Sequence, residues 1–497
     1  MEFVRNFPLF TIVPSLFMGV LCTMLKSKKA RVLTLAYECL LMGLVFSVLV
    51  YTARTGESFT YVMGEFPAPW GNEIRAGVLE AMVGLLFLIV LFSSVLGGLH
   101  FIREDIDPSK ENLYYSLVNL LTAALMAEVW TNDIFTGYVF VEIMTLTSCG
   151  ILIVREIGRT TLAAIRYMVL NLLGSGLFLL GVVLLYDVTG HLLMVPMREE
   201  IAVLRGDPRS LMVITVATGI LTIGLAIKSG LFPFHYWMPD TYGWATPASG
   251  AILSSLVSKC YIFLLLKIYF RVIGTEVFER MPVRNILFVL GVLGMVMGSV
   301  SALRENSINR MVAFSSAAQI GYIFAGIGLG GSYGYIAAVF HIMMHSVTKS
   351  LLFLTTPRLA DVSGGSLLFR NLSGAGLRDR NAGFYFMIGS FSMIGIPVFA
   401  GFASKLLFGT AAVRTGSEPR MVIMMLALAA SSLLNAMYFI RTLIRVYMDE
   451  DAGKRLPIFG RPDYNVPMLI LTAMNLLLGL TSGYAAELIE RGLRMFA

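Results

Sequence analysis

The sequence predicts an all-α polytopic membrane protein with about 14 transmembrane helices. Of its 497 residues, 57% are hydrophobic and 14% are charged, and the mean hydropathy is +0.77. Apolar runs of at least about 18 residues recur along the whole chain, and each is long enough to cross a bilayer as a helix. No long polar region separates these runs, so we expect no soluble domain.

The expected spans follow from the requirement of about 20 residues per transmembrane helix. They lie near residues 8–25, 31–52, 77–102, 113–130, 132–154, 162–187, 210–232, 245–271, 282–303, 308–328, 332–357, 382–412, 420–444 and 465–488.

Two of these spans, the seventh and the twelfth, should be broken in the middle. The seventh contains Gly230 with Pro233 close behind it, and the twelfth contains Gly395, Pro397 and Gly401. Proline removes a backbone donor and interrupts the helical ladder. Non-helical backbone at membrane depth is tolerated where it is buried in protein or faces water. Water at the two breaks would link buried groups to one another or to the bulk, although such kinks also occur as pure structure.

Lysine and arginine in the connecting loops predict the orientation. The loops on one side hold 20 of them, starting with KSKKAR at 26–31, and the side that holds both termini has 13. Positive loops stay in the cytoplasm, so both termini are expected outside a bacterial or archaeal cell membrane. The net charge of +7 is explained in this way, and no basic cluster resembles a nucleic-acid site.

The remaining basic residues are lysines inside predicted spans. They are Lys228, Lys259, Lys267, Lys349 and Lys405. An ammonium group near the bilayer centre costs roughly 3 kcal/mol on insertion scales, so such residues usually serve ion pathways. A lysine in low dielectric can lose its proton near neutral pH, whereas an arginine stays charged. We interpret the lysines that lie deeper in their spans, Lys228, Lys259 and Lys405, as proton carriers. Lys267, followed by Arg271 at the end of its span, is expected to snorkel to the interface.

Lys228 and Lys405 occupy matching contexts, each beside one of the expected helix breaks. They stand roughly 180 residues apart, which suggests a duplicated unit with one ionisable group in each half. Within FTGYVFVEIMTLTSCGILIV the acidic residue is Glu142, and Lys228 is its natural partner, because the Coulombic coupling would hold both charged. The alternative is a static ion pair that joins two helices. Asp133 is expected to cap the fifth span.

The eleventh span contains FHIMMHSVTKSLLFL, which places His341, His345 and Lys349 at i, i+4 and i+8 on one helical stripe. Histidine titrates near pH 6.5 when unperturbed, so it suits a relay between lysines. Core packing and a metal site are the alternatives. No third ligand with suitable spacing accompanies the histidines, and the lysine argues against a metal.

The four cysteines each stand alone in an apolar segment, with no C-x-x-C spacing. They are Cys22, Cys39, Cys149 and Cys260. We interpret them as packing residues rather than as disulfide or iron–sulfur ligands. No haem, flavin or iron–sulfur ligand set is present in the sequence pattern, so no cofactor is expected. Electron transfer would then belong to a partner subunit.

The stretch KSGLFPFHYWMPDTYGWATPASGAILSSLVSK resembles the signature region of the proton-translocating antiporter-like subunits. That family includes Mrp-type sodium/proton antiporters, respiratory complex I and membrane-bound energy-converting hydrogenases. Further segments agree in order: NDIFTGYVFVEIMTLTS, IRYMVLN followed by YDVTGHL, then NRMVAFSSAAQIGYIFAGIGLG, HSVTKSLLFL and GIPVFAGFASKLLFG. The resemblance covers residues 115–445, and within the family the chain looks most similar to the Mrp D subunit and its hydrogenase counterparts.

The resemblance implies two inverted five-helix repeats, at 113–271 (helices 4–8) and 282–444 (helices 9–13), flanked by helices 1–3 at 1–112 and helix 14 at 465–497. It implies that Glu142 and Lys228 form the ion pair of the family and that Lys259 is its central lysine. His345 would link the two halves, and Lys405 would match the terminal lysine or glutamate of the second half-channel.

One departure from the family concerns Gln319, which stands where some relatives carry a histidine. Glutamine cannot titrate, so water would have to bridge that position if protons pass there.

The expected function is translocation of protons, alone or with Na⁺, by one subunit of an Mrp-like or complex I- or hydrogenase-like membrane assembly. A proton would move from Lys228 to Lys259, across His345 and out by Lys405. The first alternative is a subunit of a redox-driven pump, itself without redox centres. The second is a free-standing secondary transporter, which would need polar substrate-binding groups at the breaks.

Overall fold

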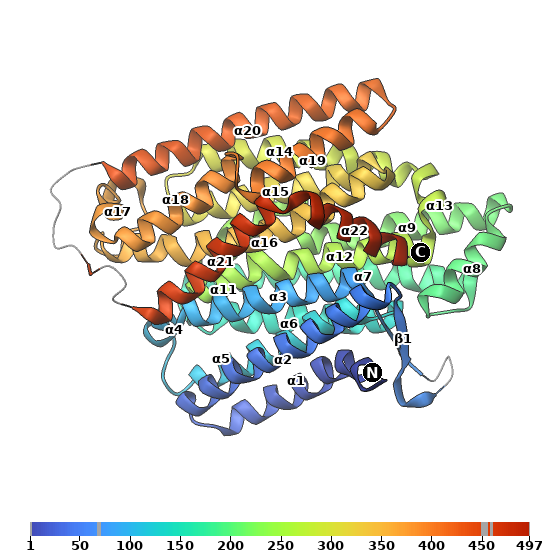
Figure 1. Cartoon of the computed structure of the whole chain (residues 1–497), viewed down its shortest axis with the longest axis horizontal. Coiled ribbons are helices and arrows are strands. Elements are labelled where there is room, and N and C mark those ends of the chain that lie inside the picture. Colours follow the sequence, from blue (N-terminus) through green and yellow to red (C-terminus); the bar gives the residue numbers. More distant parts are fainter. Residues whose placement is uncertain (1, 67–70, 449–455, 458–460, 497) are drawn as a thin grey trace.

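The computed structural model describes residues 2–66, 71–448, 456–457 and 461–496. Long helices that run roughly parallel or antiparallel to one another make up almost all of this part of the chain (Figure 1). Within it, 13 helices are long and apolar enough to cross a membrane. The all-α polytopic membrane fold predicted from the sequence is confirmed.

The first part of the chain contains six helices and one hairpin. The helices are α1 Phe7–Met24, α2 Ser27–Thr55, α3 Val78–Gly97, α4 Leu99–Asp105, α5 Glu111–Trp130 and α6 Ile134–Ile153. The strands β1 Phe59–Val62 and β2 Glu73–Ala76 pair antiparallel, with Phe59 opposite Ala76. The hairpin lies at the end of the molecule where both termini are found (Figure 1).

The middle part contains the first broken helix and two π-helical segments. The α-helices are α7 Gly158–Thr189, α8 Met194–Leu204, α9 Pro208–Ser229, α10 Met238–Trp244, α11 Pro247–Ile252, α12 Ser258–Ile268 and α13 Thr275–Arg280. The π-helical segments Leu253–Val257 and Tyr269–Ile273 precede and follow α12. A 3₁₀ turn, Phe234–Trp237, leads into α10.

The last part contains the second broken helix. Its helices are α14 Pro282–Arg304, α15 Ile308–Leu329, α16 Gly331–Asp361, α17 Ala375–Arg378, α18 Arg380–Ile394, α19 Ala400–Arg414, α20 Glu418–Tyr447, α21 Pro462–Leu480 and α22 Ser482–Phe496. Further 3₁₀ turns lie at Glu2–Asn6, Met63–Glu65 and Phe369–Asn371.

Two expected spans differ from single straight helices. The span expected at 382–412 is divided into α18 and α19, each 15 residues long. Neither half alone is long enough to cross a bilayer, which explains why 13 spanning helices are found and not 14. The span expected at 465–488 ends at Leu480, and α22 follows as a separate amphipathic helix that packs against α3.

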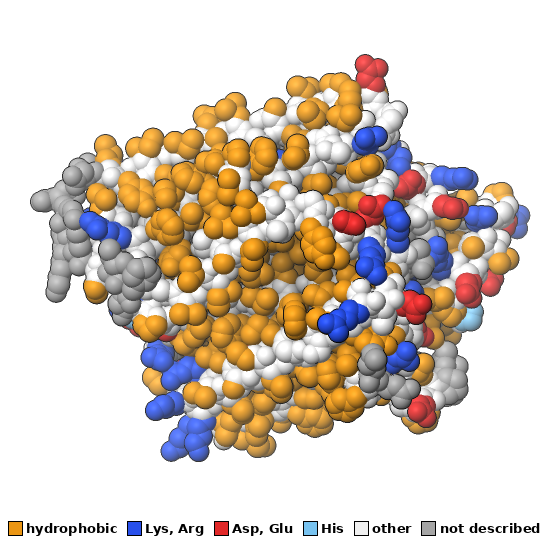
Figure 2. Space-filling view, viewed as in Figure 1, with side chains coloured by type: hydrophobic (Ala, Val, Ile, Leu, Met, Phe, Trp, Pro, Cys, Tyr) orange, Lys and Arg blue, Asp and Glu red, His pale blue; other side chains and the backbone are white. Residues whose placement is uncertain are grey.

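The helices differ in how deeply they lie. The most apolar windows of Pro247–Ile273 and Gly331–Asp361 are entirely buried, whereas those of Phe3–Met24 and Ser27–Thr55 are 33% buried. The helices that carry Lys259 and His345 therefore lie at the centre of the molecule. Figure 2 shows hydrophobic side chains over most of the visible surface, with charged side chains gathered toward its two ends. Such a band is what a bilayer requires of a spanning surface.

Helices α14 and α15 pack with their backbones in direct contact. A Cβ on Gly291 would lie 2.3 Å from the backbone N of Ala325, and one on Gly298 would lie 2.5 Å from that of Ala318. Small residues permit this approach in membrane proteins and maximise van der Waals contact between helices. The two helices therefore form one closely packed pair within the second half of the chain.

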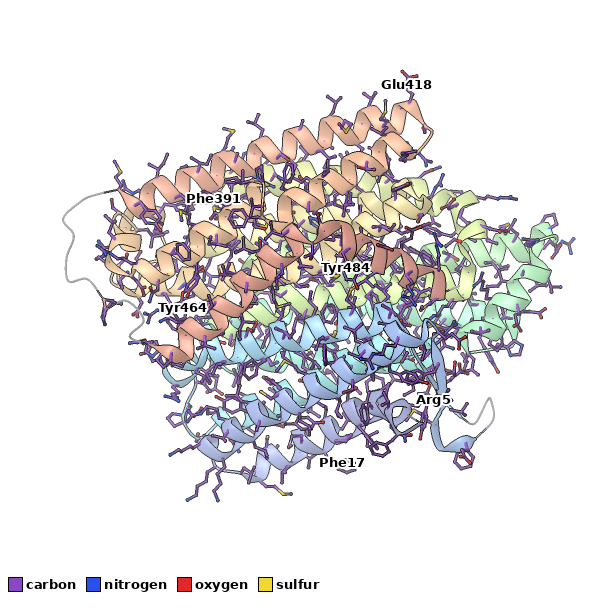
Figure 3. All side chains as sticks on the ribbon, viewed as in Figure 1. Arg5, Phe17, Phe391, Glu418, Tyr464 and Tyr484 are labelled. Carbon is purple, nitrogen blue, oxygen red and sulfur yellow. The ribbon has the colours of Figure 1, made fainter. Side chains whose placement is uncertain are left out.

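The positions of individual residues indicate which loops share a side. Figure 3 shows Arg5 near the N-terminus and Glu418 at the start of α20 at the same end of the helices, and Tyr464 at the start of α21 at the other end. This agrees with the alternation of loops expected from the succession of spans.

Candidate functional site

The first helix break lies where the sequence predicts it. Helix α9 begins after Asp207, whose carboxylate accepts hydrogen bonds from the hydroxyl and the N–H of Ser210. These bonds lower the pKa of Asp207 at the surface. The helix ends at Ser229, and Gly230 adopts the left-handed conformation with φ of +78°. Lys228 therefore stands in the last turn of α9, directly beside the break.

Lys228 is fully buried and has three neighbours that interact with its charge. Its Nζ lies 4.0 Å from Oε1 of Glu142 on α6, whose side chain is 22% exposed. The same Nζ donates a hydrogen bond to Oγ1 of Thr145 at 2.7 Å and lies 5.5 Å from the ring centroid of Tyr261. The expected ion pair is therefore formed at long range, and the ammonium group is shared with a hydroxyl and an aromatic face.

Lys259 is fully buried at the start of α12. Its Nζ donates to the carbonyl oxygen of Ser254, which lies in the π-helical segment, and to Oγ of Ser258 at 3.0 Å. It forms no ion pair within the described part of the chain. The π-helical segment beside it contacts α16, where the hydroxyl of Ser346 donates to the carbonyl oxygen of Ser255 at 2.7 Å, so the central lysine lies next to the helix that carries the histidines.

The stripe expected on α16 is present and fully buried. The rings of His341 and His345 are nearly parallel, at 8°, with centroids 6.0 Å apart. Neither ring nitrogen of His345 has a hydrogen-bond partner in the described structure. His341 shares a hydrogen bond of 2.7 Å between its Nδ1 and Oγ of Ser404 on α19. Lys349 donates to the carbonyl of Val312 on α15 at 2.8 Å.

The second helix break surrounds the amine of Lys405. Helix α18 ends at Ile394, and Gly395 turns the chain with φ of +92°. Lys405, on α19, donates to the carbonyl oxygens of Ile394 and of Met393, the latter at 3.3 Å. The lysine therefore partners carbonyl groups that the end of α18 leaves without helical partners. In contrast to Lys228 and Lys259, it is only partly buried.

Other residues hold this second break in place. The side chain of Asn475 on α21 donates to Oγ1 of Thr348 at 2.8 Å and to Oγ of Ser392 at 3.0 Å. The backbone of Val398, beside Pro397, has φ of +82°, which is an outlier for a β-branched residue and marks local strain. A Cβ on Gly401 would lie 1.7 Å from the carbonyl oxygen of Ser392, so only glycine allows α19 to start here.

The structure corrects the expectation for Lys267. Instead of snorkelling, its side chain is fully buried, and its Nζ donates to the carbonyl oxygens of Glu128 at 2.9 Å and Val129 at 3.0 Å. The expected interfacial neighbour Arg271 is also buried, with its side chain 1% exposed, in an ion pair with Glu80. The carbonyl groups near the end of α5 attract the amine inward, which sequence position alone could not reveal.

Three carboxylates were missed among the sequence-based candidates, although each lies inside an expected span. Glu38, Glu80 and Glu128 are fully buried. Both side-chain oxygens of Glu38 and of Glu128 lack hydrogen-bond partners in the described residues. The rule that singled out Glu142, an acidic group within an apolar run, applies equally to them.

Two further expectations concern caps and ligands. Asp133 caps α6 as expected, because its carboxylate accepts a hydrogen bond of 2.6 Å from the N–H of Thr136. Gln319 is buried on α15, and its Nε2 has no partner within the described structure. Among the described residues, no group of three or more His, Cys, Asp or Glu side chains is placed to hold a metal ion.

Comparison with known proteins places this chain in a family. A family model described as "NADH:quinone oxidoreductase/Mrp antiporter, TM" matches residues 131–433, more than half of the chain. The chain belongs to this family. The match includes both helix breaks and every lysine and histidine described above, so the resemblance inferred from the sequence is confirmed.

Similar chains occur in both branches that the family description names. The N subunit of the NADH-quinone oxidoreductase of Desulforudis audaxviator is 30% identical over 464 residues, with 89% of this chain and 87% of the relative covered. The D subunit of the Na⁺/H⁺ antiporter of Bacillus subtilis is 24% identical, with 98% and 96% covered.

Solved structures give the same fold. A chain of the Mrp complex from Dietzia sp. superposes with a TM-score of 0.87 at 22% identity, covering 99% of this chain and 97% of that one. A chain of the membrane-bound sulfane sulfur reductase, described as an archaeal respiratory membrane complex, superposes with a TM-score of 0.85 at 25% identity, covering 100% and 97%.

Proposed function

We propose that the chain is a proton-translocating subunit of a multisubunit membrane complex. A single observation supports this proposal: titratable side chains stand beside both helix breaks and on the buried helices α12 and α16 between them. In the order of the proposed path, the row consists of Lys228, Lys259, His345 and Lys405. Buried ionisable groups beside broken helices are costly to the fold and mark ion pathways in membrane proteins.

The contacts of these residues support a proton path more than a static scaffold. Lysine amines and imidazole nitrogens both accept and donate protons. His345 has two ring nitrogens without partners in the described structure, so it is free to exchange a proton with either side. His341 contacts Ser404, the neighbour of Lys405 in the chain. It therefore provides the link from α16 to α19. Lys349 belongs to the same stripe of α16.

The proposed mechanism begins at the ion pair of Glu142 and Lys228. Widening the 4.0 Å separation weakens the attraction that holds both groups charged. A proton then passes from the Lys228 ammonium to the Lys259 amine. His345 takes it up, and Lys405 releases it at the second break. Each step moves one proton, and no other bond changes.

We further propose that residues 113–271 and 282–444 are two inverted repeats, each with one broken helix that carries a lysine. The support is the likeness of the two breaks. Each has a glycine in the left-handed conformation, at Gly230 and at Gly395. The lysine amine lies beside the break in both, although Lys228 precedes its glycine and Lys405 follows. We include in this proposal that both termini lie on the outer side of the cell membrane. The support is the larger number of Lys and Arg residues in the loops of the opposite side.

The source of energy divides the proposal into two versions. The similarity to the D subunit of a Na⁺/H⁺ antiporter supports exchange of protons for Na⁺ driven by an ion gradient. The 30% identity to the N subunit of an NADH-quinone oxidoreductase supports the second version, in which redox chemistry in partner subunits drives the pumping. Proton uptake by vesicles after a Na⁺ pulse, compared with uptake after addition of a reductant, distinguishes the two.

Replacement of Lys259 by alanine tests the proposed function. The variant should assemble, because within the described residues the hydrogen bonds of Lys259 go to the nearby Ser254 and Ser258, yet proton transport by membrane vesicles should be lost. The matched control is Lys110→Ala, which removes an exposed lysine paired with Glu156 and should transport normally. Normal transport by Lys259→Ala would refute the proton path.

A further inference from the structure

A second group of buried charges lies between α5, α12 and α3, away from the row described above. Glu128 and Lys267 are both fully buried. Each stands in the last turn of its helix, α5 or α12. The Lys267 amine is held by the two carbonyl oxygens at the end of α5. The Glu128 carboxyl has no hydrogen-bond partner in the described structure.

This group is connected to the first row at its inner end. The charges of Lys267 and of Lys228 both act on the Glu128 carboxyl. Lys228 therefore has two carboxylates in its surroundings, Glu142 on α6 and Glu128 on α5. A carboxylate without partners at full burial is costly to the fold unless it carries a proton. The Lys228 amine itself lies 5.5 Å from the ring centroid of Tyr261 on α12, the helix that carries Lys267, so this group adjoins the first row and Glu128 is a candidate to exchange a proton with Lys228.

The group also reaches the surface at its outer end. Beyond Lys267, the buried Arg271 forms an ion pair with Glu80 and contacts Oδ1 of Asn132 at 3.5 Å. The side chain of Asn132 donates in turn to the carboxylate of Glu73 at 2.7 Å. Glu73 lies on β2 and is partly exposed. The hairpin belongs to the end of the molecule that carries both termini (Figure 1).

We propose that Glu128 and Lys267 form a second proton-transfer branch, which connects Lys228 with the face that holds the β1–β2 hairpin and the two termini. The Lys228 ammonium gives its proton to the Glu128 carboxylate and becomes an amine. The resulting acid gives the proton to the neutral amine of Lys267, which releases it to water at Asn132 and Glu73. Every step transfers one proton between two named groups and needs no further reactant.

The proposal rests on the proposed function, because the branch takes its protons from Lys228. It adds an outlet within the first half of the chain that works in the same cycle as the path through Lys259, so the loss of either one slows transport as a whole. The guanidinium of Arg271 stays charged, so it acts as a fixed charge beside the outlet. The arrangement explains why Lys267 is held inside the protein and does not lie at the interface.

Transport by the assembled complex in membrane vesicles tests the branch. Glu128→Gln and Lys267→Met remove the titratable groups and keep similar volume, and each should lower proton transport about tenfold, as expected for the loss of a positioned proton carrier. Glu38→Gln is the matched control, because Glu38 is equally buried and unpartnered but lies on the peripheral helix α2. It should transport normally. Native gels report assembly for every variant.

Two further variants separate a carrier from a structural charge. Lys267→Arg keeps a positive charge that cannot release its proton, so transport should stay low, and recovery to the wild-type level would overturn the branch. Asn132→Leu removes the polar connection to Glu73 and should also lower transport. Full transport by that variant would overturn the outlet at the hairpin.

The outcomes distinguish this inference from the proposed function. Normal transport in Glu128→Gln and Lys267→Met, together with lost transport in Lys259→Ala, would overturn the branch and leave the main path intact. An equal loss in Glu38→Gln and Glu128→Gln would also overturn the branch, since any buried carboxylate would then have the same effect.

Discussion

The ion pair between Glu142 and Lys228 permits a quantitative prediction. Glu142→Gln removes the negative charge and keeps the size and hydrogen-bonding shape of the side chain. Two unit charges at 4 Å attract by about 4 kcal/mol at an effective dielectric constant of 20. The observed separation is 4.0 Å, and the carboxylate is 22% exposed. We therefore take about half of the attraction, roughly 2 kcal/mol, as available to the transport cycle.

A change of that size should be easy to measure. Since about 1.4 kcal/mol corresponds to a tenfold change in rate, proton transport should fall at least about tenfold. The assay is the formation of a pH gradient in everted vesicles, followed by a pH-sensitive dye, with assembly of the complex checked on a native gel. Glu156→Gln serves as control, because it removes a carboxylate from an exposed ion pair with Lys110.

The same experiment can refute the reasoning. If Glu142→Gln transports at the wild-type rate, the pair is a static link between α6 and α9, and its charge plays no part in the cycle. If Glu142→Asp also loses transport, separation as well as charge is important, which agrees with the long contact observed.

The remaining predictions concern the second break and the orientation. Lys405→Glu should retain more transport than Lys405→Ala, because a carboxylic acid and an amine both donate and accept protons; equal pH-gradient responses of the two variants in vesicles would remove Lys405 from the path. An impermeant maleimide should label a cysteine placed at the exposed Lys28 only from the cytoplasmic side, because its loop is strongly basic. A cysteine at the exposed Arg205, on the opposite side, should be labelled in intact cells; the reverse pattern would invert the proposed topology.

The sequence was sufficient for the features that depend on local chemistry. Apolar runs predicted most of the spans to within a few residues, and glycine with proline predicted both helix breaks, because each of these signals acts on the backbone nearby. The stripe of His341, His345 and Lys349 followed from helical spacing alone. The cap at Asp133 is a local signal of the same kind.

Features that depend on neighbouring helices could not be predicted in this way. Lys267 lies near the end of its span, where snorkelling is the usual outcome. Two carbonyl groups from α5 hold it inside instead, and they lie more than a hundred residues away in the sequence. The proposed role of Glu128 depends on the same contact between α5 and Lys267. The end of α21 at Leu480 likewise depends on tertiary contacts, because α22 packs against α3.

The close packing of α14 against α15 has a mechanical consequence. Where two backbones touch through Gly291 and Gly298, no side chains are available to slide or to re-pack between them. Packed interfaces of this kind switch between discrete arrangements or stay fixed, and they do not deform gradually. We therefore expect α14 and α15 to move together as one rigid unit. We also expect any movement in the proposed cycle to occur at the joint between α18 and α19, where the five residues 395–399 belong to no helix.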